Sequence, residues 1–502
     1  MGVTPPTTVV ATTVLADSPG SFSQHFSLIH GWVPSLVQVA TAVVLVFAVG
    51  WRSRRWRLCW LPVAALAGVA LAWLTQHNIE TNGLAGDVAP RQLWVWIFLT
   101  GVAAVVAVVG WRGARWWRRG MSMLAVPLCL LCSALMLNLW VGYFPTVQTA
   151  WNQLTAGPLP DQTDGAMVAQ MVARHAVPPK GGVVKVSIPA AASQFKHRDE
   201  LVYLPPAYFA TNPPPTLPTV MMIGGEFNTP ADWLRAGDAV TTIDMFAAAH
   251  GGNAPVFVFV DAGGTFNNDT ECVNGPRGNS ADHLTKDVVP YLIANFGVSP
   301  ERKNWGVAGW SMGGTCAVDL ATMHPDMFSA FEDIAGDFAP NSGTKTQTIQ
   351  RLFGGDAAAY AAFDPATVIA RHGPYQGISG WFAISGNPSP AQHRTPVTID
   401  AAAVGLGGRD TAPNPGDQTA AANSLCALGS TYGIDCAVVP GSGKHDWPFA
   451  SRAFAAALPW LAGQIGTPGV PRVPLPGAVP PSAHETIAAE GHQPPLRQPA
   501  AR

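Results

Sequence analysis

The sequence has little charge, and neither sign predominates. Asp, Glu, Lys and Arg make up 12% of its 502 residues, and the formal net charge is −2. This charged share is about half of what globular proteins usually have. Without a basic excess, the sequence predicts no nucleic-acid partner. The mean hydropathy is +0.18, so low charge and high apolar content together indicate membrane segments.

Cysteine is also scarce, with seven residues in the chain. Cys129 and Cys132 have the Cys-x-x-Cys spacing, but they lie in an apolar run and no second pair joins them. The sequence therefore predicts no zinc site, no other metal and no cofactor. Cys426 and Cys436 flank a turn between a predicted helix and strand, so they could pair in an oxidising compartment.

Four apolar runs without any charged residue come first in the chain. Each is near the ~20 residues that cross a bilayer as a helix. They span about Val33–Gly50, Leu58–Leu74, Leu93–Val109 and Met123–Phe144. The sequence thus predicts a four-helix transmembrane region over residues 33–145. The N-terminus lacks a basic segment ahead of its first apolar run, which disfavours a cleaved signal peptide.

The arginines predict how these helices are oriented. The first and third connections are rich in arginine, whereas the second has only Arg91 and residues 1–32 have no Lys or Arg. The basic residues of the two rich connections are Arg52, Arg54, Arg55, Arg57, Arg112, Arg115, Arg118 and Arg119. Arginine-rich connections stay in the cytoplasm. We therefore expect a multi-pass inner-membrane protein with residues 1–32 and everything after Phe144 outside the cytoplasm.

The rest of the chain predicts one large domain between a linker and a tail. Residues 146–180 are polar and irregular, with one helical candidate near Ala166–Ala173. Over residues 181–465, apolar strand signals bounded by Gly and Pro alternate with helical spacing, which favours a mostly parallel sheet with helices on both faces. Residues 466–502 are rich in Pro and Ala, which predicts disorder. The predicted fold class is α/β, preceded by an all-α membrane region.

The segment "GWSMG" places Ser311 between Gly309 and Gly313, in the G-x-S-x-G pattern. An apolar strand precedes it, and a helix with apolar Cys316 follows. That strand–turn–helix context is the one in which a catalytic serine stands exposed at the end of a sheet strand. The pentapeptide by itself can arise by chance in a glycine-rich chain, so the context carries the prediction. Ser311 is the predicted nucleophile.

A nucleophilic serine needs a base and an acid that orients the base, in the chain order Ser, acid, His. His445 follows a late strand and precedes the final amphipathic helix, so it is the predicted base. His324, at the far end of the elbow helix, and His283, which breaks the chain order, are the weaker candidates. Asp410 ends a strand-like run and Asp417 lies at a helix cap, and both stay open as the acid.

The developing oxyanion needs two backbone N–H donors. One is expected from Met312, the residue after the nucleophile, and the other from the loop around Gly225–Phe227. Trp310, Phe227 and Trp447 adjoin these predicted groups in sequence and are the predicted substrate contacts.

The segment 218–463 resembles the esterase D-like α/β-hydrolases and, among them, the antigen 85 mycolyltransferases. The pieces that carry the resemblance are "FNTPADW", "VAGWSMGGTCAVDLATMHPDMFSAF" and "GSGKHDW". It implies an α/β-hydrolase fold, with Ser311 as nucleophile, His445 as base and an oxyanion donor at Glu226. Its register favours Asp417 over Asp410 as the acid, although the family acid is usually Glu. Phe227 stands where a sugar-contacting basic residue is expected.

These patterns predict a membrane-anchored serine esterase or acyltransferase that acts on acyl esters, chiefly lipids, of the cell envelope. The expected partners are an acyl-ester or lipid substrate, the bilayer, and a sugar or glycolipid acceptor. Mycolyl transfer to a sugar and a non-catalytic envelope-binding protein on the same fold are the alternatives. A transporter is disfavoured, because the four runs contain no ionisable residue that could line a path.

Overall fold

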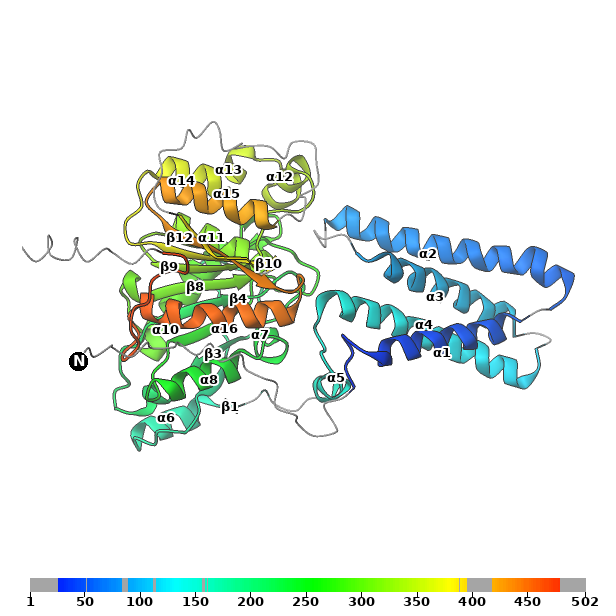
Figure 1. Cartoon of the computed structure of the whole chain (residues 1–502), viewed down its shortest axis with the longest axis horizontal. Helices are drawn as coiled ribbons and strands as arrows, with labels where there is room; N and C mark the ends of the chain where they lie inside the picture. Colours follow the sequence, from blue (N-terminus) through cyan, green and yellow to red (C-terminus); the bar gives the residue numbers. More distant parts are fainter. Residues whose placement is uncertain are drawn as a thin grey trace, which may run out of the picture.

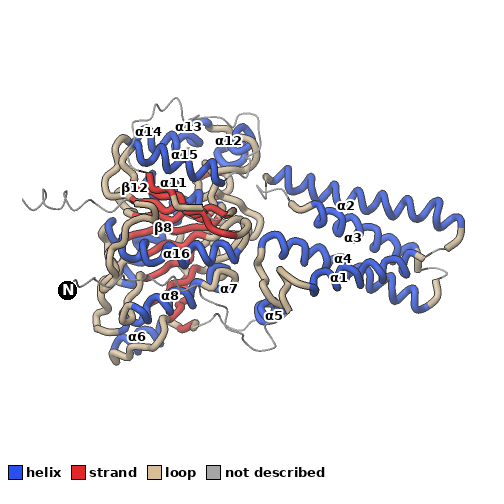
Figure 2. The backbone as a smooth tube through the Cα atoms, viewed as in Figure 1, coloured by secondary structure: helices blue, strands red, loops and turns tan. Residues whose placement is uncertain are grey.

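The computed structural model describes residues 26–50, 52–83, 89–111, 114–155, 159, 161–387, 389–394 and 418–478. These residues form two regions, which Figures 1 and 2 show side by side: four long helices and an α/β domain. We call the four helices the helical bundle and the α/β part the catalytic domain. The bundle comes first in the chain and projects from one side of the catalytic domain.

The helical bundle consists of the four apolar runs predicted from the sequence. Its helices are α1 (Trp32–Val49), η2 with α2 (Trp56–Trp60 and Leu61–Asn82), α3 (Arg91–Val109) and α4 (Trp116–Val141). All four are long and apolar enough to cross a membrane. The second helix is longer than its apolar run, because helical hydrogen bonding continues through polar residues until Gly83, which has a φ of 63°.

A ten-stranded sheet forms the centre of the catalytic domain. From one edge to the other the strand order is β1-β2-β3-β5-β4-β8-β9-β10-β12-β11. The strands are β1 (Gln162–Thr163), β2 (Gly182–Val186), β3 (Glu200–Leu204), β4 (Thr219–Ile223), β5 (Val256–Val260), β8 (Trp305–Trp310), β9 (Ala330–Ile334), β10 (Ser379–Gly386), β11 (Gln392–Arg394) and β12 (Asp435–Ser442). From β5 to β12 all neighbours are parallel, while β3 runs antiparallel to both of its neighbours. This arrangement confirms the predicted α/β-hydrolase fold.

Helices cover both faces of the sheet, so the apolar strands are buried on each side. One face packs against α10 (Val289–Phe296), α11 (Met312–Met323) and α15 (Gln418–Thr431). The other packs against α8 (Ala239–Ala249) and the closing helix α16 (Trp447–Gln464). Burial on both faces explains why these strands read as continuous apolar runs.

Several elements lie outside the predicted domain borders. The predicted linker contains α5 (Val147–Leu154), strand β1 and α6 (Gly165–Ala173), the last as expected. Beyond residue 465 the chain still packs on the domain, where Leu475 is only 4% exposed, so the tail cannot begin at residue 466. Three short helices between β9 and β10 are additional: α12 (Lys345–Phe353), α13 (Ala357–Phe363) and α14 (Pro365–His372).

Two disulfides join parts of the catalytic domain. Cys426 pairs with Cys436, which confirms the pairing considered from the sequence. Cys272 pairs with Cys316, which the sequence suggested only as an apolar helix residue. The second bridge therefore ties the helix that follows Ser311 to the loop that follows β5.

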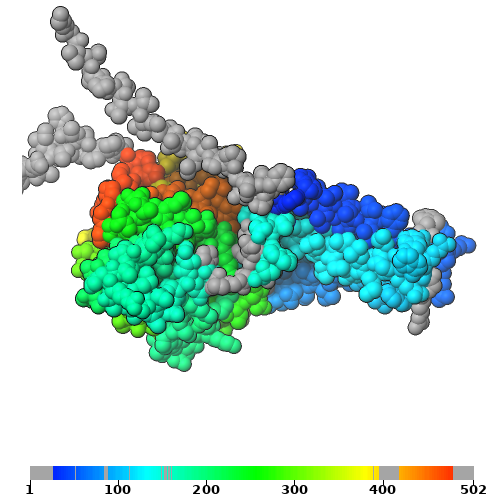
Figure 3. All heavy atoms as spheres, turned by 90° about the horizontal axis from the view of Figure 1, so that it is seen from below, coloured from blue at the N-terminus to red at the C-terminus, as the bar shows by residue number. Residues whose placement is uncertain are grey.

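The bundle and the catalytic domain touch through helix ends that lie far apart in sequence (Figures 1 and 3). At the end of α4, the Tyr143 hydroxyl donates a hydrogen bond to Asp232. At the end of α2, Arg351 donates to the Glu80 carbonyl at 2.7 Å, and Arg277 to the Asn82 carbonyl at 2.7 Å. We call these contacts the junction.

Candidate active site

Ser311 occupies the sharp turn between β8 and α11. Its φ of 58° and ψ of −122° are unusual for a residue with a side chain and cost about 1–3 kcal/mol. A Cβ on Gly309 would lie 1.9 Å from the Gly313 carbonyl oxygen, and one on Gly313 would lie 2.3 Å from the Ile223 carbonyl oxygen. Both flanking positions of the motif therefore require glycine, for reasons of space in this chain.

His445 lies within hydrogen-bonding distance of the serine. It belongs to the loop between β12 and α16, and its Nε2 is 2.9 Å from the Ser311 Oγ. The next residue, Asp446, caps α16 by accepting a hydrogen bond from the Phe449 N–H at 3.0 Å. The cap anchors the loop directly beside the imidazole.

The other two histidine candidates lie elsewhere in the domain. His283 is fully buried, and its Nε2 is 2.9 Å from Glu200 Oε1. His324 caps the C-terminal end of α11, opposite the end that carries the serine. His445 is thus the histidine that the fold brings to Ser311.

The outer nitrogen of the imidazole faces the start of α15. Gln418, the first residue of that helix, contacts His445 Nδ1 through its side-chain amide. Asp410 and Asp417 lie outside the described residues, and Gln418 directly follows Asp417 in the chain. To accept a serine proton at Nε2, the ring must carry its own hydrogen on Nδ1, so its partner there must be an acceptor. A carboxylate meets that requirement, whereas the Gln418 atom that faces Nδ1 is its amide nitrogen, which is a donor.

Two tryptophans back the imidazole. The Trp310 ring stacks on His445 with centroids 5.2 Å apart and contacts Trp447 at 4.7 Å. Trp310 is 4% exposed and Trp447 1% exposed, so both belong to the core beneath the histidine. We therefore assign Trp310 and Trp447 to positioning the His445 ring. Of the three predicted substrate contacts, Phe227 remains the proposed one.

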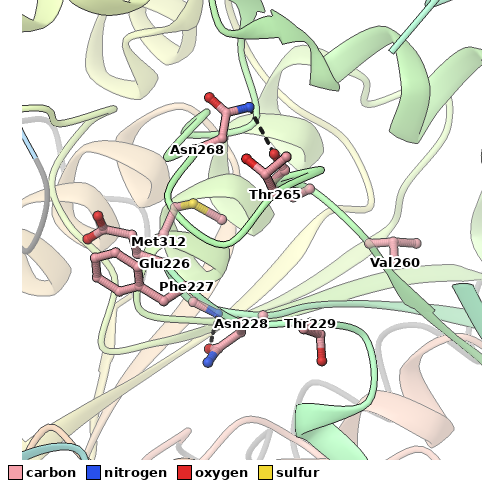
Figure 4. Close-up of a pocket in the computed structure, with 12 residues that line it drawn as sticks. Glu226, Phe227, Asn228, Thr229, Val260, Thr265, Asn268 and Met312 are labelled. Atoms are coloured by element: carbon pink, nitrogen blue, oxygen red, sulfur yellow. Dashed lines mark hydrogen bonds between the residues drawn. The ribbon is translucent and has the colours of Figure 1, made fainter. Parts of the chain in front are cut away.

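A tight turn after β4 lies against Ser311. It is closed by the Asn228 N–H donating to the Gly225 carbonyl at 3.1 Å, and by the Gly225 N–H donating to Asn228 Oδ1 at 2.8 Å. A Cβ on Gly225 would lie 3.2 Å from the Ser311 Cβ. Within the turn, Glu226 and Phe227 lie with Met312 at one side of a small pocket (Figure 4). These are the positions from which the predicted backbone donors would reach an oxyanion.

An aromatic pair lies beside the same pocket. Phe227 lines the pocket, and its ring lies 5.3 Å from the ring of Phe266, which comes from the loop after β5 and is 70% exposed. Phe227 is half-buried, so the exposed Phe266 ring offers the larger surface for the apolar part of a substrate. The sequence analysis missed Phe266, because a single exposed aromatic in a loop carries no periodic signal.

Arg198 stabilises the turn after β4 through hydrogen bonds. Arg198 donates to both carboxylate oxygens of Asp261, at 2.9 and 2.6 Å, and to the Asn228 carbonyl at 2.9 Å. Burial would raise the pKa of Asp261, but the hydrogen bonds from Arg198 outweigh it and hold the pKa below its usual range. The ionised pair thus fixes the end of β5 against the turn after β4.

Several carboxyl groups of the catalytic domain are buried. Burial raises the pKa of Asp333 to about 7, and its Oδ1 accepts a hydrogen bond from the Gly336 N–H at 2.7 Å. Burial also raises the pKa of Asp319, within α11, and that of Glu271. Only a few polar partners offset that desolvation, so these acids favour the protonated form.

Comparison with known proteins finds similarity to esterases and acyltransferases. Residues 196–398 match the family model described as putative esterase. An uncharacterised protein of Corynebacterium glutamicum is 29% identical over 384 residues, covering 71% of this chain and 83% of that protein. The diacylglycerol acyltransferase/mycolyltransferase Ag85A of Mycobacterium ulcerans is 40% identical over 81 residues, which cover 16% of this chain and 23% of that protein. A solved ferulic acid esterase has 17% identity and a TM-score of 0.41, covering 57% of this chain and 99% of its own.

The family match, the strand order and the sharp turn at Ser311 define the class of protein. The catalytic domain has the α/β-hydrolase fold, and its sequence is similar to the putative esterase family and to the antigen 85 proteins. The chain is accordingly a serine hydrolase or acyltransferase that acts on acyl esters. The family match ends at residue 398, before His445, so the histidine is assigned from its distance to Ser311.

Proposed function

We propose that the chain is a membrane-anchored serine esterase or acyltransferase that uses Ser311 and His445 on lipid acyl esters outside the cytoplasm. The observation that carries the catalytic part is the 2.9 Å separation of His445 Nε2 from Ser311 Oγ at a strained turn. A serine hydroxyl needs such a base to become nucleophilic.

The reaction has two steps. In the first, His445 accepts the Ser311 proton while Oγ attacks the ester carbonyl, and the protonated imidazole then gives that proton to the leaving alcohol. The backbone N–H groups of Met312 and Glu226 hold the oxyanion. In the second, water or an acceptor hydroxyl loses a proton to His445 and attacks the acyl-serine, and His445 then gives that proton to Ser311 Oγ as the acyl product leaves. Asp417 is the proposed orienting acid, with Asp410 as the alternative.

The bundle supports a membrane site for this chemistry. Its outward side chains are large and apolar, as shown by Val108 at 76%, Val46 at 69% and Leu66 at 68% exposure. A soluble protein would bury such faces, whereas lipid covers them without cost. The end of α4 lies close to the active-site loop, because a Cβ on Gly142 would come within 3.0 Å of the Asp446 Cβ. The reacting serine would thus lie near the end of the membrane helices.

Basic residues support the proposed orientation. Arg52 joins the ends of α1 and α3 by donating to the Gly110 carbonyl at 2.9 Å. This end of the bundle carries the two arginine-rich connections and lies opposite the catalytic domain (Figure 1). Positive residues favour the cytoplasmic side. The catalytic domain would therefore lie on the other side.

Hydrolysis of p-nitrophenyl esters by the full chain in detergent tests the catalytic part. Ser311→Ala should lower kcat/KM by at least about 1,000-fold without changing the melting temperature. Equal activity in the variant would overturn the assignment. Adding trehalose or glycerol then distinguishes the two activities: a transferase forms the acyl-acceptor ester, and a hydrolase forms only free acid.

A reporter fused after Arg502 tests the orientation. Alkaline phosphatase fused there should be active, because it needs an oxidising compartment to form its disulfides. An inactive phosphatase together with a fluorescent cytoplasmic reporter at the same position would refute the orientation while leaving the esterase assignment intact.

A further inference from the structure

Two histidines and a glutamate meet at the end of the sheet that carries β3, and the proposed catalytic steps do not use them. Glu200 is the first residue of β3, His197 lies three residues before it, and His283 is the first residue of the π-helical segment η4 (His283–Val288). The His197 Nδ1 and His283 Nε2 atoms lie 2.8 and 2.9 Å from the same oxygen, Glu200 Oε1. The side chain of His197 is 8% exposed, and those of Glu200 and His283 are fully buried.

We propose that His197, Glu200 and His283 form a zinc site. Their three ligand atoms lie within 4.8 Å of one another. Two imidazoles and one carboxylate are a ligand set that binds Zn²⁺ in proteins. Zinc bonds of about 2.0–2.2 Å in a tetrahedron place ligand atoms about 3.4 Å apart, so each of the two nitrogen–Oε1 pairs would separate by roughly half an ångström. The backbone carbonyl of Arg198, 2.7 Å from His197 Nδ1, supplies a further oxygen at this point.

The surroundings of the rings have the pattern of a metal site. Metal-binding histidines usually donate their other ring N–H to a carboxylate or a carbonyl. For His283 that acceptor is Asp287, 3.4 Å from Nδ1, and Asp287 is itself held by the Ala192 N–H at 2.8 Å. The His197 ring also hydrogen-bonds to the Ile188 backbone. The orientation of both rings is therefore fixed from outside the cluster.

The metal-free alternative is a network of hydrogen bonds in which one carboxylate oxygen serves two rings. Both imidazoles lie at hydrogen-bonding distance from Glu200 Oε1, while Glu200 Oε2 has no hydrogen-bond partner among the described residues. A buried polar atom without a partner destabilises the folded chain. A Zn²⁺ ion bound by this carboxylate would come within reach of that second oxygen.

Zinc binding to the full, tag-free chain in detergent tests this proposal. After treatment with a chelator, exposure to ZnCl₂ and desalting, the chain should hold one zinc, and Glu200→Gln and His283→Gln should bind it at least about 100-fold more weakly. Titration in buffers of different ionisation enthalpy should show that zinc binding releases protons. Asp435→Asn is the matched control: it removes the carboxylate of an exposed histidine pair, His393–Asp435, and should leave zinc binding unchanged.

X-ray absorption of the zinc-loaded wild-type chain gives a readout that no variant can confound by misfolding. The expected spectrum has two imidazole nitrogens at about 2.0–2.1 Å. Wild-type chain that holds no more zinc than Glu200→Gln would overturn the proposal and leave a hydrogen-bond network. A zinc spectrum without imidazole would overturn it as well.

Discussion

The bundle and the catalytic domain differ in how much large apolar surface they leave outside. Inside the bundle lie small residues such as Ala48, Ala64, Ala103 and Ala125, none more than 1% exposed, together with a few large ones such as Trp96, while many other large apolar residues face outward. Inside the catalytic domain lie large aromatics such as Trp233, which is fully buried. Small residues let helices approach closely when lipid already covers the apolar outside. A domain in water instead gains stability by burying large apolar surfaces.

Glycine serves each region differently. In the bundle, α2 and α3 cross at Gly68 and Gly101, where a Cβ on Gly101 would lie 2.8 Å from the Gly68 Cα. In the catalytic domain, Gly313 lets the strained serine turn lie against β4. Gly68 and Gly101 permit close packing between helices, whereas Gly313 permits the backbone turn that presents Ser311. The two regions should therefore respond separately to substitution.

The largest expected effect falls on catalysis alone. His445→Ala removes the base, so kcat/KM for an ester should fall by about 1,000–10,000-fold. His324→Gln, at the other end of α11, is the control and should retain the wild-type rate. Ester hydrolysis by both variants in detergent gives the comparison. Full activity of His445→Ala would show that His445 is not the catalytic base.

One glycine from each region sharpens the contrast. Gly313→Ala should lower ester hydrolysis by at least about 100-fold, because the new methyl group collides with the Ile223 carbonyl and displaces the serine turn. Gly101→Ala should leave kcat nearly unchanged and lower the melting temperature of the full chain by several degrees, an overpacking cost of about 1–3 kcal/mol.

Gly120→Ala, with no atom within 4 Å of the added Cβ, is the matched control for both glycine variants. Loss of catalysis in Gly101→Ala with an unchanged melting temperature would mean that the two regions are not separable.

A buried acid makes the stability of the catalytic domain depend on pH. Burial raises the pKa of Glu332, in β9, to about 8 from its usual value of 4.5. The unfolded chain then releases this proton first, so its contribution is fully present below pH 4.5 and is lost as pH rises to about 8. Glu332→Gln should therefore stabilise the domain at pH 8 by about 1–3 kcal/mol and have little effect at pH 4.5.

Thermal unfolding of wild type and Glu332→Gln across this pH range makes the measurement. A difference between the two proteins that stays constant with pH would show that Glu332 is ionised in the folded chain.

The smallest effect is expected at the junction. Tyr143→Phe removes the hydrogen bond to Asp232 and should lower stability by about 1 kcal/mol, with activity retained. Differential scanning fluorimetry of the full chain measures it. An Asp232→Asn variant that shows the same shift, and no further shift in the double variant, would assign the effect to this contact.

Some features were predictable because their signal is local. The four apolar runs predicted four helices, and the strand–turn–helix context predicted the position of Ser311. The loop of His445 was predictable from the strand before it and the helix after it. In each case neighbouring residues supply the pattern.

Other features depend on contacts that no local pattern records. Strand β9 was missed because its sequence, "AFEDI", contains two acids that are nevertheless buried in the sheet centre. The bridge Cys272–Cys316 joins residues 44 positions apart. His197, Glu200 and His283 come together only because the segment that enters β3 lies against the first residue of η4. The choice between Asp410 and Asp417 concerns residues outside the described part of the chain.

Labelling with a fluorophosphonate probe tests the central claim most directly. The full chain in membranes is treated with the probe, reduced and digested with trypsin, and the labelled peptide is sequenced by mass spectrometry. The account predicts a label on Ser311, within the peptide Asn304–Lys345. It predicts no label on Ser311→Ala and much slower labelling of His445→Ala. A folded wild-type chain that carries the label on another serine, or none at all, would contradict it.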